Sequence, residues 1–110
     1  MNTASTIYLG DLRTQATHIR SGNQIITDAP PDNHGKGEAF SPTDLVSAAL
    51  LSCMMTVVGI MANTHQIDVS GMTGEVLKVM GTDPRRITKI HIELRFPRDY
   101  KEHDRVLIER

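Results

Sequence analysis

The sequence predicts an α+β domain in which antiparallel strands pack around long, buried central helices. Two patterns support this fold class. Apolar and polar residues alternate from residue 87 to residue 96, as expected of a half-buried strand. By contrast, residues 45–62 carry no charged side chain, and a helix that is apolar on all of its faces normally lies inside a protein.

The N-terminal third predicts a small antiparallel meander followed by a long loop. Its β-prone runs lie at residues 6–9, 15–20 and 24–27. Turn signals at Gly10-Asp11 and Ser21-Gly22 separate these runs. Residues 28–38 are rich in Pro, Asp, Asn and Gly, so we expect a loop there, and loops of this length are often functional.

The C-terminal half predicts two long strands and the start of a second helix. Residues 67–80 form the first of these strands, with Gly71 and Gly74 marking a bulge or a bend. Pro97 ends the strand over residues 87–96, and a second helix is expected to begin near Tyr100. Because the sequence stops in mid-helix, we expect it to be a fragment that lacks the rest of this helix and a closing strand.

The central helix has a well-defined start. Ser41 is a good N-cap, Pro42 suits the first helical position, and Asp44 completes an S-x-x-D capping pattern. The uncharged run is long enough to span a membrane. Polar residues are spread around it, however, and it has neither an aromatic belt nor flanking Lys/Arg bias. A buried central helix is therefore the favoured interpretation.

Composition limits the classes of function. The 110 residues predict one domain, and a core with only 4% aromatic residues would gain from oligomerisation. A net charge of −1 without a Lys/Arg cluster argues against nucleic-acid binding. The polar N-terminus does not resemble a secretion signal, and a single cysteine suits a reducing compartment, so we expect a cytoplasmic protein.

Cys53 is the first candidate for chemistry. A lone cysteine is more often a small buried hydrophobe than a catalyst. Cys53 lies about three turns beyond the helix start, where the helix dipole no longer acts, so a reactive thiolate would need a donor from elsewhere. The five histidines show no metal-type spacing, and there is no phosphate-binding glycine loop, so no metal or cofactor is expected.

The run from Gly37 to Cys53 resembles the signature of the OsmC/Ohr family of small thiol-dependent hydroperoxide reductases. In that family, a helix start like Ser41-Pro-Thr-Asp-Leu45 leads through small and apolar residues to the peroxidatic cysteine. The element order agrees over essentially the whole chain. The resemblance implies an OsmC-like fold over residues 1–110, an intertwined homodimer, and active sites at the dimer interface.

The same resemblance implies a peroxidase that protects against oxidative stress. Cys53 matches the thiolate that attacks organic or fatty-acid hydroperoxides, and a lipoyl-type dithiol then serves as reductant. Arg20 matches the arginine that supports the thiolate, although it could equally be an exposed turn residue. The family's acidic partner falls at Thr43, with Asp44 beside it, and Asp44 could instead serve only as a helix cap.

The sequence departs from the family in lacking the second, resolving cysteine, so the chain is either a fragment or a one-cysteine variant. Two further interpretations remain. The protein could be a non-catalytic OsmC-like dimer that binds an apolar small molecule at its interface, with Cys53 only part of the core. Alternatively, the loop over residues 28–38 could bind a partner protein, for which loop length is the one supporting observation.

Overall fold

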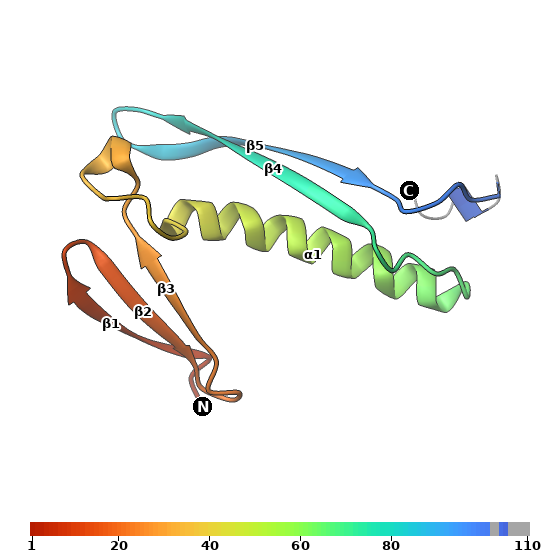
Figure 1. Ribbon diagram of the computed structural model, residues 1–110, viewed down its shortest axis with the longest axis horizontal. Coiled ribbons are helices and arrows are strands. Elements are labelled where there is room, and N and C mark those ends of the chain that lie inside the picture. Colours follow the sequence, from red (N-terminus) through yellow and green to blue (C-terminus); the bar gives the residue numbers. More distant parts are fainter. Residues whose placement is uncertain (102–103, 106–110) are drawn as a thin grey trace. The chain divides into compact units, whose positions relative to one another are not determined.

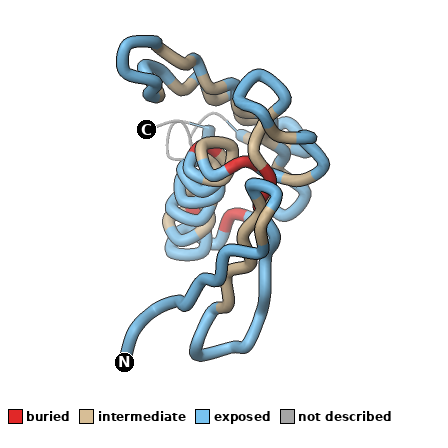
Figure 2. Tube along the Cα trace, turned by 90° about the vertical axis from the view of Figure 1, so that its left-hand side faces the viewer, coloured by how far each residue is buried: buried red, intermediate tan, exposed pale blue. Residues whose placement is uncertain are grey.

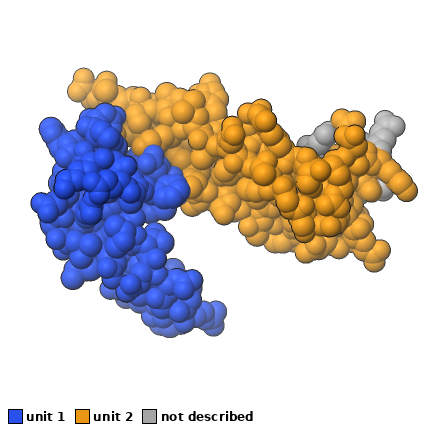
Figure 3. Space-filling model, viewed as in Figure 1, with its two compact units in different colours: residues 1–45 blue, residues 46–110 orange. Residues whose placement is uncertain are grey.

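The structure is a computed structural model that describes residues 1–101 and 104–105, and it is an α+β protein (Figure 1). The elements, in chain order, are β1 (Ala4–Gly10), β2 (Arg13–His18), β3 (Gln24–Asp28), the 3-10 turn η1 (Pro31–Asn33), α1 (Pro42–Thr64), β4 (Thr73–Gly81) and β5 (Arg86–Arg95). The chain divides into two compact units, residues 1–45 and residues 46–110 (Figure 3). Whether they make up one domain stays a prediction.

The first unit contains the predicted meander. Its three strands form an antiparallel sheet in the order β1-β2-β3. The β2–β3 ladder runs from the pair Arg13↔Asp28 at one end to Thr17↔Gln24 at the other. The sheet has little core of its own, because every residue of β1 up to Leu9 is exposed.

The expected loop follows β3 and is folded tightly on itself. The amide of Gly37 donates a hydrogen bond to the carbonyl of Ala29 (3.1 Å), and Gly35 donates to Pro30 (3.0 Å). A Cβ at position 35 would lie 1.7 Å from the carbonyl oxygen of Ala29, so only glycine fits there. The loop is therefore an ordered substructure with its own hydrogen bonds.

Helix α1 begins as its sequence predicts. The hydroxyl of Ser41 accepts a hydrogen bond from the Asp44 amide (3.1 Å), and the Ser41 amide donates to the Asp44 carboxylate (3.0 Å). This reciprocal pair is a capping box. The helix ends at Thr64, where Gln66 adopts a positive φ of 57° and the Ile67 amide bonds back to the Ala62 carbonyl (2.8 Å).

The second unit contains the β4–β5 hairpin, and here one prediction is wrong. The strand expected from residue 67 begins only at Thr73. The preceding residues turn instead, because the Asp68 carboxylate accepts the Ser70 amide (2.9 Å) and Gly71 has a φ of 90°. Of the two glycines expected to mark a bulge or a bend, Gly71 lies in this turn, whereas the irregularity in the β4–β5 register lies between Val79 and Met80.

A small core joins the end of α1 to the segment after β5. Ala62 and Ile67 are buried at its centre. Partly buried side chains pack around them, namely Val58, Met61, Val69, Phe96 and Tyr100. The Tyr100 hydroxyl donates a hydrogen bond to the Asp68 carbonyl (2.7 Å), which fixes the segment after β5 against the loop that follows α1.

The prediction of a buried helix does not hold within one chain. Ser47 and Ala62 are the two buried residues of α1, and most of its other positions are exposed (Figure 2). Contact with the hairpin occurs on one face, where a Cβ at Gly74 would meet a Leu51 methyl at 2.7 Å. A two-stranded hairpin cannot surround a helix, so the opposite face is exposed among the described residues. The predicted second helix lies mostly outside the described residues, with Asp104 and Arg105 helical.

Candidate functional site

Cys53 lies on the exposed face of α1, in a regular line of exposed side chains. We call this line the Cys53 stripe; it consists of Val46, Leu50, Cys53, Val57, Ile60 and Thr64. Its members alternate at spacings of four and three residues, which places them along one side of a helix. Four of the six are large apolar residues and all six are exposed. The thiol is therefore accessible, and its surroundings along the helix are apolar.

The stripe has the pattern of a helix-packing seam. Alternating steps of three and four residues are the a/d spacing by which one helix packs against another. Val57 is 59% exposed and Ile60 is 63% exposed, so no residue that the structure describes covers them fully. Exposed apolar patches of this kind are typical of surfaces that bind another molecule.

Asp44 is close to the helix start and points away from Cys53. Nine residues separate the two along α1, which corresponds to a rotation of about 180° around the helix axis and a rise of about 13 Å. Asp44 forms the capping box with Ser41. Asp44 thus stabilises the start of the helix, and the helix does not bring its carboxylate to the thiol.

Arg20 lies in the exposed turn between β2 and β3. It lines a shallow hollow with His18 and the first three residues of the chain. The turn is held by the His18 ring, whose Nδ1 is 2.6 Å from the Ser21 hydroxyl. The catalytic role of Arg20 stays a prediction.

Within the first unit, Arg20 and Asp44 occupy opposite ends of the β2–β3 ladder. Arg20 follows the Thr17↔Gln24 end. The helix start follows the other end, because the Asp28 amide bonds to the Phe40 carbonyl (3.0 Å). Four strand residues, about 13 Å, separate the two ends. The first unit thus does not bring together the arginine and the acid expected to form one site.

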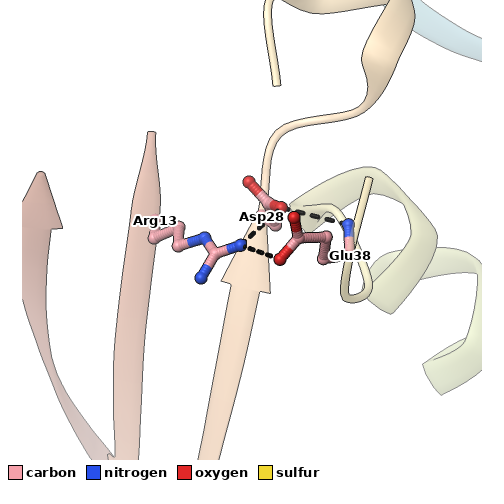
Figure 4. Close-up of polar contacts among 3 residues, drawn as sticks. All are labelled: Arg13, Asp28 and Glu38. Atoms are coloured by element: carbon pink, nitrogen blue, oxygen red, sulfur yellow. Dashed lines mark hydrogen bonds and ion pairs between the residues drawn. The ribbon is translucent and has the colours of Figure 1, made fainter. Parts of the chain in front are cut away.

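A charged cluster that the sequence did not reveal lies at the helix end of this ladder (Figure 4). Arg13 Nη2 is 2.5 Å from Glu38 Oε2 and 3.4 Å from Asp28 Oδ2. The backbone amide of Glu38 also donates to Asp28 Oδ2 (3.0 Å). The Asp28 side chain is only 1% exposed, and its Oδ1 has no hydrogen-bond partner within the described residues.

The opposite charges of the cluster stabilise one another. The hydrogen bond from the Glu38 amide, and then the positive charge of Arg13, lower the pKa of Asp28 below its usual value despite its burial. Conversely, the contact with the Glu38 carboxylate raises the pKa of Arg13. Both groups are therefore charged at neutral pH. Arg13 and Asp28 are 15 residues apart, so only the strand register, which pairs them, could have indicated their contact, and Glu38 lies outside that register.

Comparisons with known proteins define the class of this chain. The sequence model of the family described as OsmC-like protein matches residues 35–108, which is well over half of the chain and includes the whole of α1. The protein therefore belongs to the OsmC-like family. A search among curated protein sequences found no match.

Solved structures agree with this assignment. A candidate osmotic stress induced and detoxification response protein from Psychrobacter arcticus shares 50% sequence identity with a TM-score of 0.93, over 99% of this chain and 80% of that chain. The organic hydroperoxide resistance protein OsmC of Legionella pneumophila has a TM-score of 0.66 at 15% identity, over 99% of this chain and 81% of that one. An OsmC-like protein of unknown function from Vibrio cholerae has a TM-score of 0.71 at 17% identity, over 99% and 86% respectively. The last two show the fold alone.

Proposed function

We propose that this protein is a thiol-dependent peroxidase that reduces organic or fatty-acid hydroperoxides, with Cys53 as the peroxidatic residue. The observation that carries the proposal is the exposed Cys53 thiol in the middle of an apolar stripe, on the helix that the family model covers. A thiolate attacks the peroxide, and an apolar surface beside it suits the hydrocarbon part of an organic peroxide. The name of the Legionella pneumophila protein, which has the same fold, agrees with this chemistry.

The proposed reaction has two stages. The Cys53 thiolate attacks the terminal oxygen of the hydroperoxide, the O–O bond breaks, and the departing alkoxide takes up a proton to leave as an alcohol. The sulfur is thereby oxidised to a sulfenic acid. A dithiol reductant of the lipoyl type then attacks the sulfenic acid, releasing water and forming a mixed disulfide. Its second thiol displaces Cys53, which regenerates the reduced protein and leaves an oxidised, cyclic disulfide.

The reductant has to supply both thiols as far as these 110 residues are concerned, because Cys53 is their single cysteine. The proposal therefore predicts turnover with dihydrolipoamide. A monothiol should be less effective, since two separate molecules must then react in sequence.

We further propose that the active form is a homodimer in which a second copy covers the Cys53 stripe. The seam-like spacing of the stripe and its exposed Val57 and Ile60 support this arrangement. By length and composition alone α1 could also cross a membrane. Its other face, however, packs against protein, since Leu51 approaches Gly74 and Ala62 is fully buried. A protein partner therefore fits the helix better than lipid does.

A titration of free thiol tests the enzyme proposal. The reduced protein is mixed with one equivalent of cumene hydroperoxide, and thiol loss is followed against time, with hydrogen peroxide as comparison. Fast stoichiometric loss with the organic peroxide, and slower loss with hydrogen peroxide, is expected. Because these 110 residues contain one cysteine, the signal belongs to Cys53.

Two controls complete the test. The Cys53→Ser variant should show no thiol signal and no turnover with dihydrolipoamide, although it should fold normally. If the thiol of the folded, unmodified protein survives both peroxides for minutes, the enzyme proposal fails. Binding of an apolar small molecule would then be the better account of the stripe.

A further inference from the structure

A buried carboxylate, that of Asp28, bridges the two ends of the segment between the sheet and the Cys53 helix. We call residues 29–37 the strap. Its two ends meet where the Gly37 amide bonds to the Ala29 carbonyl. Directly outside these ends, Asp28 bonds through its carboxylate to the amide of Glu38 (3.0 Å), so the last residue of β3 holds the first residue after the strap.

Asp28 makes this connection at three points. Its carboxylate receives the Glu38 amide and lies 3.4 Å from the Arg13 guanidinium, while its own amide donates to the Phe40 carbonyl (3.0 Å). Arg13 also reaches the Glu38 carboxylate, which closes a ring of contacts between β2, β3 and the segment after the strap (Figure 4). Without the Asp28 carboxylate, the segment after the strap would keep only the main-chain bond to β3 and the contact between Arg13 and Glu38.

The strap leads directly into the helix start. Phe40 precedes Ser41, which is 1% exposed and caps α1. Helix α1 is continuous from Pro42 to Thr64, so its first residue and Cys53 lie on the same helix, about 16 Å apart along its axis.

We propose that Asp28 is a positioning residue, which closes the strap on the sheet and thereby fixes the segment from which the Cys53 helix starts. This proposal rests on the peroxidase function proposed above. In such a reaction the thiolate must be aligned with the groups that hold the peroxide, and a misplacement of about 1 Å can cost roughly a hundredfold in rate. Asp28 acts on the reaction only through this placement.

The first test is limited trypsin digestion of the purified protein, followed by mass spectrometry. Lys36 is exposed within the strap, so cleavage after it reports how often the strap opens. Asp28→Asn keeps the shape of the side chain and removes its charge, and we expect cleavage at Lys36 to become about tenfold faster, because hydrogen bonds to a charged group are the stronger ones. Asp68→Asn is the matched control. Asp68 also accepts a backbone amide and pairs with an arginine, Arg98, but it lies outside the strap, so cleavage at Lys36 should not change.

The second measurement compares two reactions of Cys53 across a pH series, one with cumene hydroperoxide and one with iodoacetamide. Alkylation depends on exposure and thiolate fraction but needs little alignment. For Asp28→Asn we expect the peroxide rate to fall about tenfold while the alkylation rate and its pH profile stay unchanged. A general loss of structure would instead alter both rates.

Each outcome decides a part of the proposal. Unchanged cleavage at Lys36 would overturn the closing role of Asp28. Faster cleavage with an unchanged ratio of the two rates would overturn its positioning role. If Asp28→Asn does not fold, Glu38→Gln replaces it, because Glu38 is 60% exposed and the change removes only the charge that faces Arg13; a two- to threefold effect of the same sign is then expected. A failure of the peroxidase proposal is seen separately. In that case Cys53 of the unmodified protein does not react with peroxide, while the rate of cleavage at Lys36 still reports how often the strap opens.

Discussion

Replacing Ile60 by serine tests whether the Cys53 stripe is the dimer seam. Ile60 is 63% exposed in one chain, and full burial of an isoleucine stabilises by about 1.5–3 kcal/mol. Covering the exposed part therefore contributes about 1.5 kcal/mol per copy. A two-fold interface contains the residue twice, so the variant should lose about 3 kcal/mol of dimer stability. That loss corresponds to roughly a hundredfold weaker Kd.

The effect can be separated from changes in the helix itself. Isoleucine and serine have similar helix propensities, so the folded monomer should be little affected. Leu77→Ser is the matched control, because Leu77 is also 63% exposed but lies on β4, outside the stripe. Analytical ultracentrifugation over a dilution series gives both dissociation constants. An unchanged Kd for Ile60→Ser, or an equal loss for Leu77→Ser, would refute the assignment of the seam.

Four further substitutions test the local structure by thermal or chemical unfolding. Gly35→Ala should destabilise the protein, because its Cβ would lie 1.7 Å from the Ala29 carbonyl oxygen, whereas Gly59→Ala, with open space around it, should stabilise α1 by about 0.5–1 kcal/mol. Ser41→Ala removes the capping hydroxyl and should cost about 1 kcal/mol. Because the pKa of Asp28 is lowered on folding, its charge contributes stability above about pH 4 that is lost as the pH falls through the folded pKa. Asp28→Asn should therefore be less stable than the unmodified protein at pH 7, and this difference should shrink toward pH 3.

Each of these four predictions has a result that would contradict it. A Gly35→Ala variant as stable as the unmodified protein would show that the strap can move away from the added methyl group. A destabilised Gly59→Ala would indicate that a partner packs closely at that position. A Ser41→Ala variant without loss would mean that the Asp44 carboxylate alone satisfies the helix start. A stability difference for Asp28→Asn that stays constant with pH would exclude its charge as the cause.

Local patterns predicted the parts of the fold that neighbouring residues determine. The helix start at Ser41 and the alternating strand before Pro97 both depend on residues within a few positions, and both are confirmed. The strand expected at residues 67–72 was predicted from local β-propensity as well, and there the prediction was wrong. In the structure Asp68 forms a turn with Ser70, and Ile67 is buried against Ala62. Propensity cannot weigh such a tertiary contact.

The candidate site was less predictable because its contacts join distant segments. Cys53 could be singled out as the one cysteine, and family resemblance gave it a role. Arg13 and Glu38 are 25 residues apart, and no local pattern links them. The antiparallel register that places Arg13 opposite Asp28 is the missing information, because it exists only once the strands have paired.

The exposed face of α1 links the assembly of this protein to the reactivity of Cys53. An uncharged helix was expected to be buried, yet one chain covers only the face that carries Leu51 and Ala62. Whatever covers the other face must also surround Cys53, because the thiol lies within the same stripe. The proposed partner would therefore set both the dielectric environment of the Cys53 sulfur and the shape of the space in which a peroxide would bind. Assembly and reactivity should change together in Ile60→Ser, whereas the Asp28→Asn variant should lose reactivity and remain a dimer.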